Sequence, residues 1–146
     1  MTLSNKQLSH YRVEREIGQG GMATIYRAID TRTEGVVALK VLMAHWARDL
    51  VVLRRFQKEG ENARRLQHPN IAQVYDAGQA EGQHFIVMKY AGNGSMDRLI
   101  QRHKEQKSPM RVEESIAYLR PVAAALDYAH SQGILHRDIK PSNVLI

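Results

Sequence analysis

The most specific signal in the sequence is one short segment, which reads His136-Arg137-Asp138-Ile139-Lys140-Pro141-Ser142-Asn143. It follows Val112–Gln132, where apolar residues recur at helical spacing and predict a long amphipathic helix that Gly133 ends. Carboxylate, guanidinium, ammonium and amide groups crowd into this single loop. A solvated connection is the plain alternative, but it does not need so many polar groups together. The loop is therefore a candidate catalytic site.

Upstream of the long helix the chain divides at Gly92–Gly94, where strand-like patterns give way to helical ones. Ser95 is a suitable N-cap for a short helix that runs to about His103, and residues 104–109 form a polar loop. Pro121 lies inside the pattern of the long helix and predicts a bend there. The second part of the chain is therefore expected to be helical.

The first part of the chain reads as a small antiparallel sheet. Alternating and β-branched runs predict strands at about 11–17, 24–29, 36–42, 72–77 and 84–89. The first three strands are joined by connections too short for crossover helices, so they must be antiparallel. The last two are separated by a polar hairpin at 79–83.

A glycine-rich loop joins the first two strands. Residues 18–23 read Gly-Gln-Gly-Gly-Met-Ala, close to G-x-G-x-x-G with Ala23 in the last glycine position. Glycines let backbone N–H groups approach phosphate oxygens without a Cβ in the way. A dinucleotide-binding fold requires a helix directly after such a loop, whereas Thr24–Ile29 alternates as a strand. The loop is a candidate phosphate site in a hairpin, and an ordinary glycine-rich turn is the alternative.

Residues 49–67 predict a helix between the third and fourth strands. Apolar residues, among them Leu53 and Phe56, recur in this segment at near-helical spacing. Gly60 weakens this helix, and Pro69 ends it.

A lysine on the third strand has a candidate partner on this helix. Ala38 and Lys40 share one face of the strand, which suits a flat ring packed beside a cation that grips phosphates. Such a lysine needs a carboxylate to hold its ammonium, and Glu59 or Glu61 could supply it. The two lie about 200° apart around a helix, and Glu59 is on the side of Phe56. We therefore predict the pair Lys40–Glu59, with a solvated strand-end lysine as the alternative.

Composition excludes several other classes. The chain has no cysteine, so disulfides and thiolate metal sites are ruled out. Its net charge is +6, but the basic residues are scattered and interleaved with acidic ones, so we expect no nucleic-acid partner. No stretch has the length of a signal peptide or a membrane helix, and a cytoplasmic location is expected for this region, although a longer protein could carry an anchor elsewhere. A dimer is left open.

The segment 136–143 matches H-R-D-x-x-x-x-N at every defined position. Together with the glycine loop, the strand lysine and the helix glutamate in this order, it makes the chain resemble the eukaryotic-type Ser/Thr protein kinases, and most of all their bacterial members. The resemblance covers Tyr11–Ile146. It implies an α+β fold with a five-stranded antiparallel sheet and one helix, followed by the first helices of an incomplete helical lobe. The implied divisions are an N-terminal extension at 1–10, an N-lobe at 11–91 and a partial C-lobe at 92–146.

The resemblance also implies an ATP site. Adenine would lie under Ile17, Ile25 and Ala38 and over Leu145, with Lys40 on the α- and β-phosphates and Glu59 holding Lys40. The phosphates would be covered by the loop residues Gly18, Gln19, Gly20, Gly21, Met22 and Ala23. The adenine edge would bond to the backbone of the hinge, which follows the gatekeeper Met88 and consists of Lys89, Tyr90 and Ala91.

In the catalytic loop, the resemblance implies that Asp138 accepts or orients the proton of a substrate hydroxyl. Lys140 would steady the γ-phosphate, and Asn143 would bind Mg²⁺. The implied function is transfer of the γ-phosphate of ATP to a serine or threonine of a protein substrate. No D-F-G follows Asn143 in this sequence, so we expect the chain by itself to be a truncated and inactive domain. The alternatives are a pseudokinase-like module that binds nucleotide or a partner, and a truncation product without function.

Overall fold

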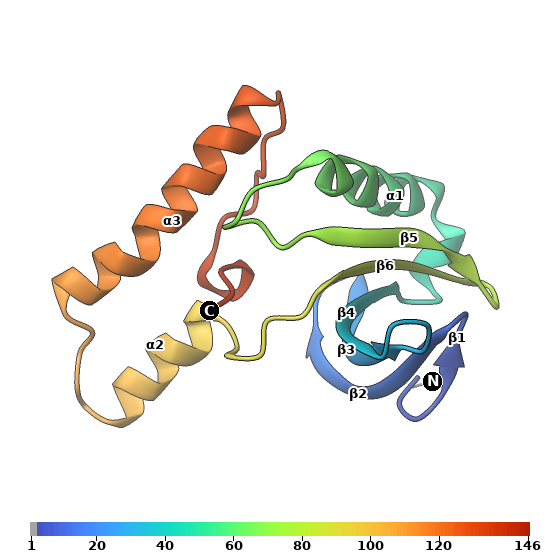
Figure 1. Ribbon diagram of the computed structural model, residues 1–146, viewed down its shortest axis with the longest axis horizontal. Helices are drawn as coiled ribbons and strands as arrows, with labels where there is room; N and C mark the ends of the chain where they lie inside the picture. The colour runs from blue at the N-terminus through green and yellow to red at the C-terminus, as the bar shows by residue number, and fades with distance from the viewer. Residues whose placement is uncertain (1–2) are drawn as a thin grey trace. The chain divides into compact units, whose positions relative to one another are not determined.

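The computed structural model describes residues 3–146 and divides them into two compact units (Figure 1). The first unit contains the described residues up to Gln67 together with Ala72–Tyr90, and the second contains His68–Ile71 and Ala91–Ile146. The first unit holds β1 (Gln7–Leu8), β2 (Tyr11–Gln19), β3 (Ala23–Asp30), β4 (Gly35–Leu42), the 3₁₀ turn η1 (Trp46–Arg48), α1 (Leu50–Arg65), β5 (Val74–Ala80) and β6 (Gln83–Lys89). The second unit holds α2 (Met96–Glu105), α3 (Val112–Ser131) and the 3₁₀ turn η2 (Pro141–Asn143). Among residues 3–146, no helix has the length and apolar character that a membrane crossing requires.

One antiparallel sheet, in the order β1-β2-β3-β4-β6-β5, forms the body of the first unit. The five predicted strands are present as β2 to β6. The additional strand β1 pairs through Gln7↔Arg12 and Leu8↔Tyr11, and its two residues are too few to show an alternating pattern in the sequence. The expected fold class, an antiparallel sheet with one helix followed by helices, is confirmed.

The hairpin between β5 and β6 is tighter than predicted. β5 extends to Ala80, three residues beyond the expected end, and the turn consists of Glu81 and Gly82. Both residues have positive φ, 51° and 75°, which is the backbone that two-residue hairpin turns require. The polar composition of the region located the hairpin correctly but did not fix its length.

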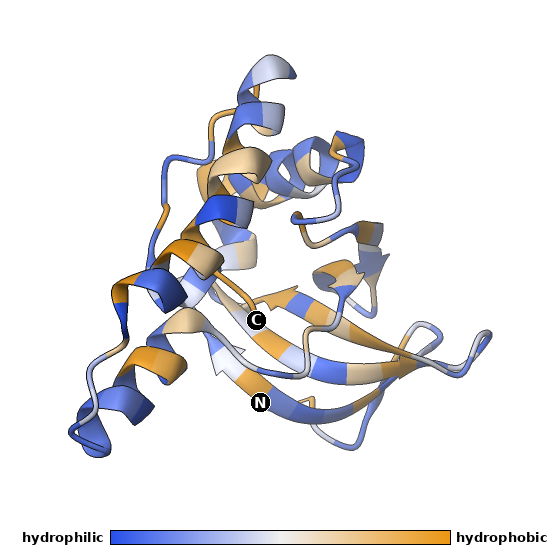
Figure 2. Cartoon of the chain, turned by 60° about the vertical axis from the view of Figure 1, so that its left-hand side comes forward, coloured by the Kyte–Doolittle hydropathy of each residue, from blue (hydrophilic) through white to orange (hydrophobic). Residues whose placement is uncertain are grey.

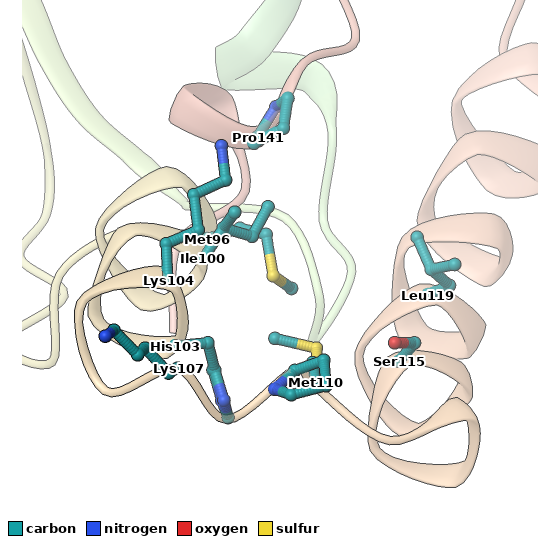
Figure 3. Close-up of a pocket in the computed structure, with 10 residues that line it drawn as sticks. Met96, Ile100, His103, Lys104, Lys107, Met110, Ser115, Leu119 and Pro141 are labelled. Carbon is teal, nitrogen blue, oxygen red and sulfur yellow. The ribbon is translucent and has the colours of Figure 1, made fainter.

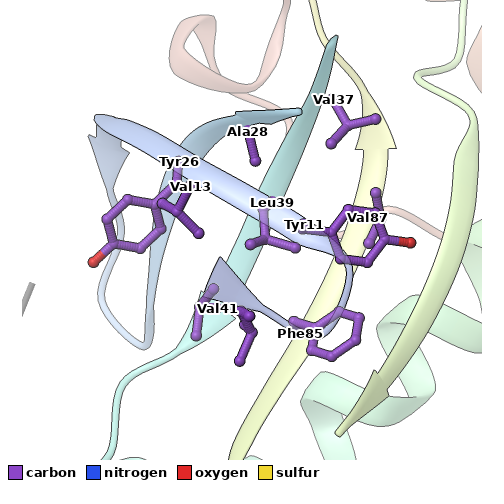
Figure 4. Packing of buried hydrophobic residues seen from close by; sticks show 10 residues of the cluster. Tyr11, Val13, Tyr26, Ala28, Val37, Leu39, Val41, Phe85 and Val87 are labelled. Atoms are coloured by element: carbon purple, nitrogen blue, oxygen red, sulfur yellow. The ribbon is translucent and has the colours of Figure 1, made fainter. Parts of the chain in front are cut away.

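The curled sheet encloses a hydrophobic core on its inner face (Figure 4). Residues two apart on a strand share a face, so β4 contributes Val37, Leu39 and Val41 to this core. Hydrophobic stretches lie along the strands of the sheet (Figure 2). Tyr11 packs edge-on against Phe85 at a centroid distance of 5.8 Å. The cluster is made of Leu8, Tyr11, Val13, Tyr26, Ala28, Val37, Leu39, Val41, Phe85 and Val87. The opposite face of β3, β4 and β6 remains for α1 and for the candidate site.

Helix α1 packs against β5 and β6 on that opposite face, and Gly60 makes the close approach. A Cβ at Gly60 would lie 3.2 Å from two side-chain carbons of Ile86 and 3.4 Å from the Cβ of Ala77. Gly60 was expected to weaken the helix, but the structure gives it a packing role. The helix begins after Asp49, whose carboxylate accepts hydrogen bonds from the N–H groups of Val51 and Val52 at 2.8 and 3.2 Å.

In the second unit, α3 continues without a break through Pro121. Gly133 ends the region as predicted, with a φ of +73° and a hydrogen bond from its N–H to the carbonyl of His130. The helix buries Ala125 and Ala129, whereas Ile116 and Leu119 are 47% and 59% exposed. One apolar face of α3 is therefore uncovered in the described chain.

Candidate active site

The glycine-rich loop connects β2 to β3 and is closed by a hydrogen bond of 2.8 Å from the Gly20 N–H to the Ala23 carbonyl. Gly20 and Gly21 do not have positive φ, and a Cβ on Gly21 would meet nothing within 4 Å. The fold of the chain therefore does not itself require glycine at Gly21. The backbone at Gly21 is open on the side where a Cβ would lie.

Strand register gathers four of the predicted adenine and phosphate residues on one face of the sheet. Ile25 lies opposite Lys40 in the pairing of β3 with β4, and Ala38 lies opposite Met88 in the pairing of β4 with β6. Directly opposed residues share a face, and so do residues two apart on a strand. Ile17 lies on β2 at the register shift between Glu16 and Gly18.

Lys40 forms an ion pair and a hydrogen bond with Glu59. The predicted choice of Glu59 as its partner is confirmed. The Lys40 ammonium also lies 5.9 Å from the centroid of the Phe56 ring. Phe56 precedes Glu59 by about one turn of α1. The Lys40 side chain is 19% exposed and that of Glu59 43%, so the pair lies at the border between the protein and solvent.

The proposed hinge begins at the end of β6. The N–H of Lys89 donates to the carbonyl of Gln73 at 2.9 Å, so the sheet already uses this donor. Tyr90 and Ala91 follow the end of β6. Arg27 of β3 lies over the ring of Tyr90, 5.6 Å from its centroid, and pairs with Glu14 of β2. Ala91 is the first residue of this segment that belongs to the second unit.

The catalytic-loop candidates come together within the second unit. The ammonium of Lys140 lies 2.8 Å from Oδ2 of Asp138. Nδ2 of Asn143 donates to the backbone carbonyl of Asp138 at 2.8 Å and to its carboxylate at 3.2 Å. The hydrogen bond from Lys140 lowers the pKa of Asp138 below its ordinary value, with smaller lowering effects from Asn143 and His136. The Asp138 carboxylate is thus held ionised between two donors.

The backbone of this loop has an unusual conformation near its start and is paired with another segment after its end. Arg137 has a φ of +63°, a conformation that is unfavourable for a side chain with a Cβ and is common at functional sites. After η2, Leu145 forms a β-bridge with Ser95, and the N–H of Met96 donates to the carbonyl of Val144 at 2.8 Å. Leu145, the expected floor for adenine, is 48% exposed. Ser95 stands at the N-cap of α2 as predicted, but its hydroxyl donates to Asp97 instead of capping the helix.

The catalytic loop offers oxygen ligands of the kind that Mg²⁺ prefers. Among residues 3–146, no three His, Asp or Glu side chains cluster in a way that could hold a metal ion. Magnesium is commonly held by one or two protein oxygens together with substrate phosphates and water. The amide oxygen of Asn143 fits that mode of binding.

Sequence reasoning missed Trp46, whose side chain contacts the predicted phosphate loop. The indole Nε1–H of Trp46 donates to the carbonyl of Gly21 at 3.0 Å. Trp46 lies in η1, 25 residues away in the sequence, and no pattern in the sequence connects the two positions.

A separate hollow of about 600 Å³ lies in the second unit between α2 and α3 (Figure 3). Its apolar lining includes Met96, Ile100, Met110 and Leu119, with Pro141 at one side. None of the predicted ATP-binding or catalytic residues lines it. The hollow therefore meets the catalytic loop at Pro141 without containing the proposed binding and catalytic side chains.

Comparison with known proteins supplies the family. Residues 11–146 match the family model described as the protein kinase domain. The chain is 39% identical over 137 residues to a probable serine/threonine-protein kinase PknB of Lactococcus lactis, covering 93% of this chain and 21% of that protein. It is 38% identical over 140 residues to serine/threonine-protein kinase PknD of Mycobacterium tuberculosis, covering 96% of this chain and 20% of that protein.

Solved structures agree with this result. The crystal structure of the Mycobacterium tuberculosis PknI kinase domain superposes with a TM-score of 0.82 at 37% identity. The match covers 99% of this chain and 58% of that one. The chain therefore spans about one fifth of the curated relatives and somewhat more than half of the solved kinase domain.

Proposed function

Because the chain belongs to the protein kinase family, we propose that the protein containing it transfers the γ-phosphate of ATP to serine or threonine hydroxyls of protein substrates. The observation that carries the proposal is the cluster in which Lys140 and Asn143 both donate to Asp138. Phosphoryl transfer requires positioning and charge neutralisation more than covalent chemistry, and this cluster provides a carboxylate, an ammonium and an amide at one point. A domain that consumes ATP works where ATP is, so we propose a cytoplasmic location for these residues.

Each residue of the cluster has a distinct proposed task. Asp138 accepts or orients the proton of a substrate hydroxyl, because the lowered pKa keeps its carboxylate ionised and able to accept a hydrogen bond from that hydroxyl. Lys140 stabilises the charge of the transferred phosphate, and its contact with Asp138 keeps it in the loop until substrate arrives. Asn143 offers its amide oxygen to Mg²⁺. When bound, this ion would neutralise charge on the phosphate oxygens.

ATP is proposed to bind against the face of the sheet that carries Ile25, Ala38, Lys40 and Met88. Adenine would pack on the apolar members of this set, together with Ile17 and Leu145, and its edge would bond to the hinge backbone at 89–91. The small side chain of Ala38 leaves room for a ring beside the strand. Lys40, held by Glu59, would contact the α- and β-phosphates, and the backbone of residues 18–23 would cover them.

We propose the lobe division 11–91 and 92–146, with residues 1–10 as an extension. These 146 residues span somewhat more than half of the solved kinase domain that they match. The chain taken alone is therefore proposed to bind nucleotide while transferring little phosphate. A pseudokinase-like module that binds nucleotide or a partner is the second candidate.

The test uses a purified protein that contains this chain, incubated with γ-labelled ATP, magnesium and a basic protein substrate. Label should appear on phosphoserine and phosphothreonine, and Asp138→Asn should reduce the rate by about 100-fold or more. Phosphotyrosine as the main product would refute the proposed residue specificity. Nucleotide binding without any transfer that depends on Asp138 would support the binding-module candidate instead.

A further inference from the structure

Trp46 in η1 is the single tryptophan of the chain. Its indole N–H donates to the carbonyl of Gly21 at 3.0 Å, near the tip of the glycine-rich loop. The ring is partly buried and packs against the cluster that contains Phe56 and Ile86. The side chain is therefore anchored on the body of the first unit while its one polar atom reaches the loop.

This bond determines how the loop backbone is oriented. In a trans peptide, the carbonyl of one residue and the N–H of the next point in opposite directions. Because the indole holds the Gly21 carbonyl, the N–H of Met22 is directed away from Trp46. The carbonyl of Met22 is held in turn by the N–H of Met43 at 3.0 Å. Both carbonyls of the loop tip are thus turned toward the segment between β4 and α1.

The same segment supports the other phosphate contact of the first unit. The N–H of Asp49 donates to the carbonyl of Trp46 at 3.1 Å, and Asp49 caps the helix that carries Glu59. Glu59 holds Lys40. Trp46 therefore has two contacts. Its side chain holds the glycine-rich loop, and its carbonyl accepts from Asp49, which caps the helix that carries Glu59.

We propose that Trp46 is a positioning residue for phosphate binding, whose indole N–H holds the Gly21 carbonyl so that the Met22 N–H is presented to a nucleotide phosphate. The inference rests on the proposed function, because it needs a nucleotide at this loop. Trp46 itself does not touch the ligand. Its effect is exerted on the triphosphate part of the nucleotide and not on the adenosine part.

A purely structural role of Trp46 makes a different prediction. Loss of packing in the cluster lowers stability and disturbs every ligand contact of the unit. Trp46→Phe keeps an aromatic ring for packing and removes only the donor and part of the ring area. Val52→Ala is the matched control, because Val52 packs against the same cluster and its side chain has no hydrogen-bond donor.

The experiment measures, for the whole chain, the affinity of Mg²⁺-AMP-PNP and of adenosine by calorimetry in the wild type and both variants. Trp46→Phe should weaken AMP-PNP about three- to tenfold, which is the effect of one hydrogen bond, and leave adenosine within about twofold. Val52→Ala should leave the ratio of the two affinities unchanged. Hydrogen exchange of the peptide covering residues 18–23 should accelerate in Trp46→Phe and not in Val52→Ala.

Equal weakening of AMP-PNP and adenosine in Trp46→Phe would overturn the proposal. Failure of the wild type to bind either compound would contradict the proposed function itself, which is a different result. Should Trp46→Phe not fold, the fluorescence of Trp46 in the wild type decides the matter. Its emission should change on addition of Mg²⁺-AMP-PNP and not with adenosine, and the same change with both ligands would overturn the inference.

Discussion

The ammonium of Lys140 lies 2.8 Å from Oδ2 of Asp138, so the proposed base and the proposed phosphate ligand are already in contact without substrate. Asn143 donates to the same carboxylate at 3.2 Å. Both side chains of the ion pair are more than half exposed, so this contact adds little to stability. Its effect falls on the protonation of Asp138, where a positive neighbour favours the ionised form.

Lys140→Met should raise the pKa of Asp138 toward its ordinary value, because the largest lowering influence is removed. The folded-state pKa of Asp138 lies below its unfolded value, so its contribution to stability is complete above the unfolded pKa. That contribution is lost as the pH falls through the folded pKa. NMR titration of the Asp138 carboxyl carbon measures the shift directly. Lys107→Met is the control, and an unchanged pKa in Lys140→Met would contradict the assignment.

Lys40 and Glu59 are expected to act as one unit in nucleotide binding. Lys40→Met and Glu59→Gln should each weaken Mg²⁺-AMP-PNP by about tenfold, as expected for a charged hydrogen bond at a partly exposed site. The double variant should be little weaker than either single variant, because the second change removes an interaction that is already lost.

The control for this cycle is Glu61→Gln, which removes the other candidate carboxylate of α1. It should leave the affinity within about twofold, because Lys40 is paired with Glu59. If the loss of affinity in the double variant equalled the product of the two single losses, the residues would act independently.

The pair Lys40–Glu59 was predictable because its two halves follow from local periodicity. The side of α1 that carries Glu59 is fixed by its spacing from Phe56, and the face of Lys40 by alternation along β4. The predicted strands and helices are likewise local patterns. The clustering of Asp138, Lys140 and Asn143 is also local, since all three lie within one loop.

What the sequence did not predict depends on contacts between distant segments. Trp46 reaches Gly21 across 25 residues, and a bond from a side chain to a backbone carbonyl leaves no signature in either segment. The close packing at Gly60 was not predicted, because helix propensity describes an isolated helix, whereas Ile86 and Ala77 on the sheet decide what fits at this position. Strand β1 has too few residues for a period to be visible.

The uncovered face of α3 predicts self-association of the 146-residue chain. Ile116 and Leu119 are 47% and 59% exposed, and adjoining apolar side chains of this kind favour association. Ile116→Glu combined with Leu119→Glu should shift sedimentation toward the monomer. Ala117→Glu, at an exposed position on a different side of the helix, is the control for added charge. A wild-type chain that sediments as a monodisperse monomer at high concentration would contradict the prediction.

Gly60→Ala should fail to stabilise the protein, although it replaces glycine inside a helix. The substitution adds about 1 kcal/mol of helix propensity. Against this, the new Cβ would lie 3.2 Å from two carbons of Ile86, closer than the usual carbon–carbon separation of about 3.5–4.0 Å. Ile86 is 2% exposed and has little freedom to move, and overpacking in such a place costs about 1–3 kcal/mol. We expect a net loss of about 1 kcal/mol in the free energy of unfolding, measured with urea.

The partner substitution tests the cause of that loss. Ile86→Val removes the terminal methyl of Ile86, one of the two carbons that the new Cβ would meet, and should cost about 1 kcal/mol alone. In the double variant Gly60→Ala with Ile86→Val the two costs should partly cancel, giving a favourable coupling of about 1 kcal/mol. Glu59 is the neighbour of Gly60, so Gly60→Ala should also weaken Mg²⁺-AMP-PNP binding, and Ile86→Val should restore part of it. Simple additivity of the two stability changes would show that the contact between α1 and β6 does not set the fit at Gly60.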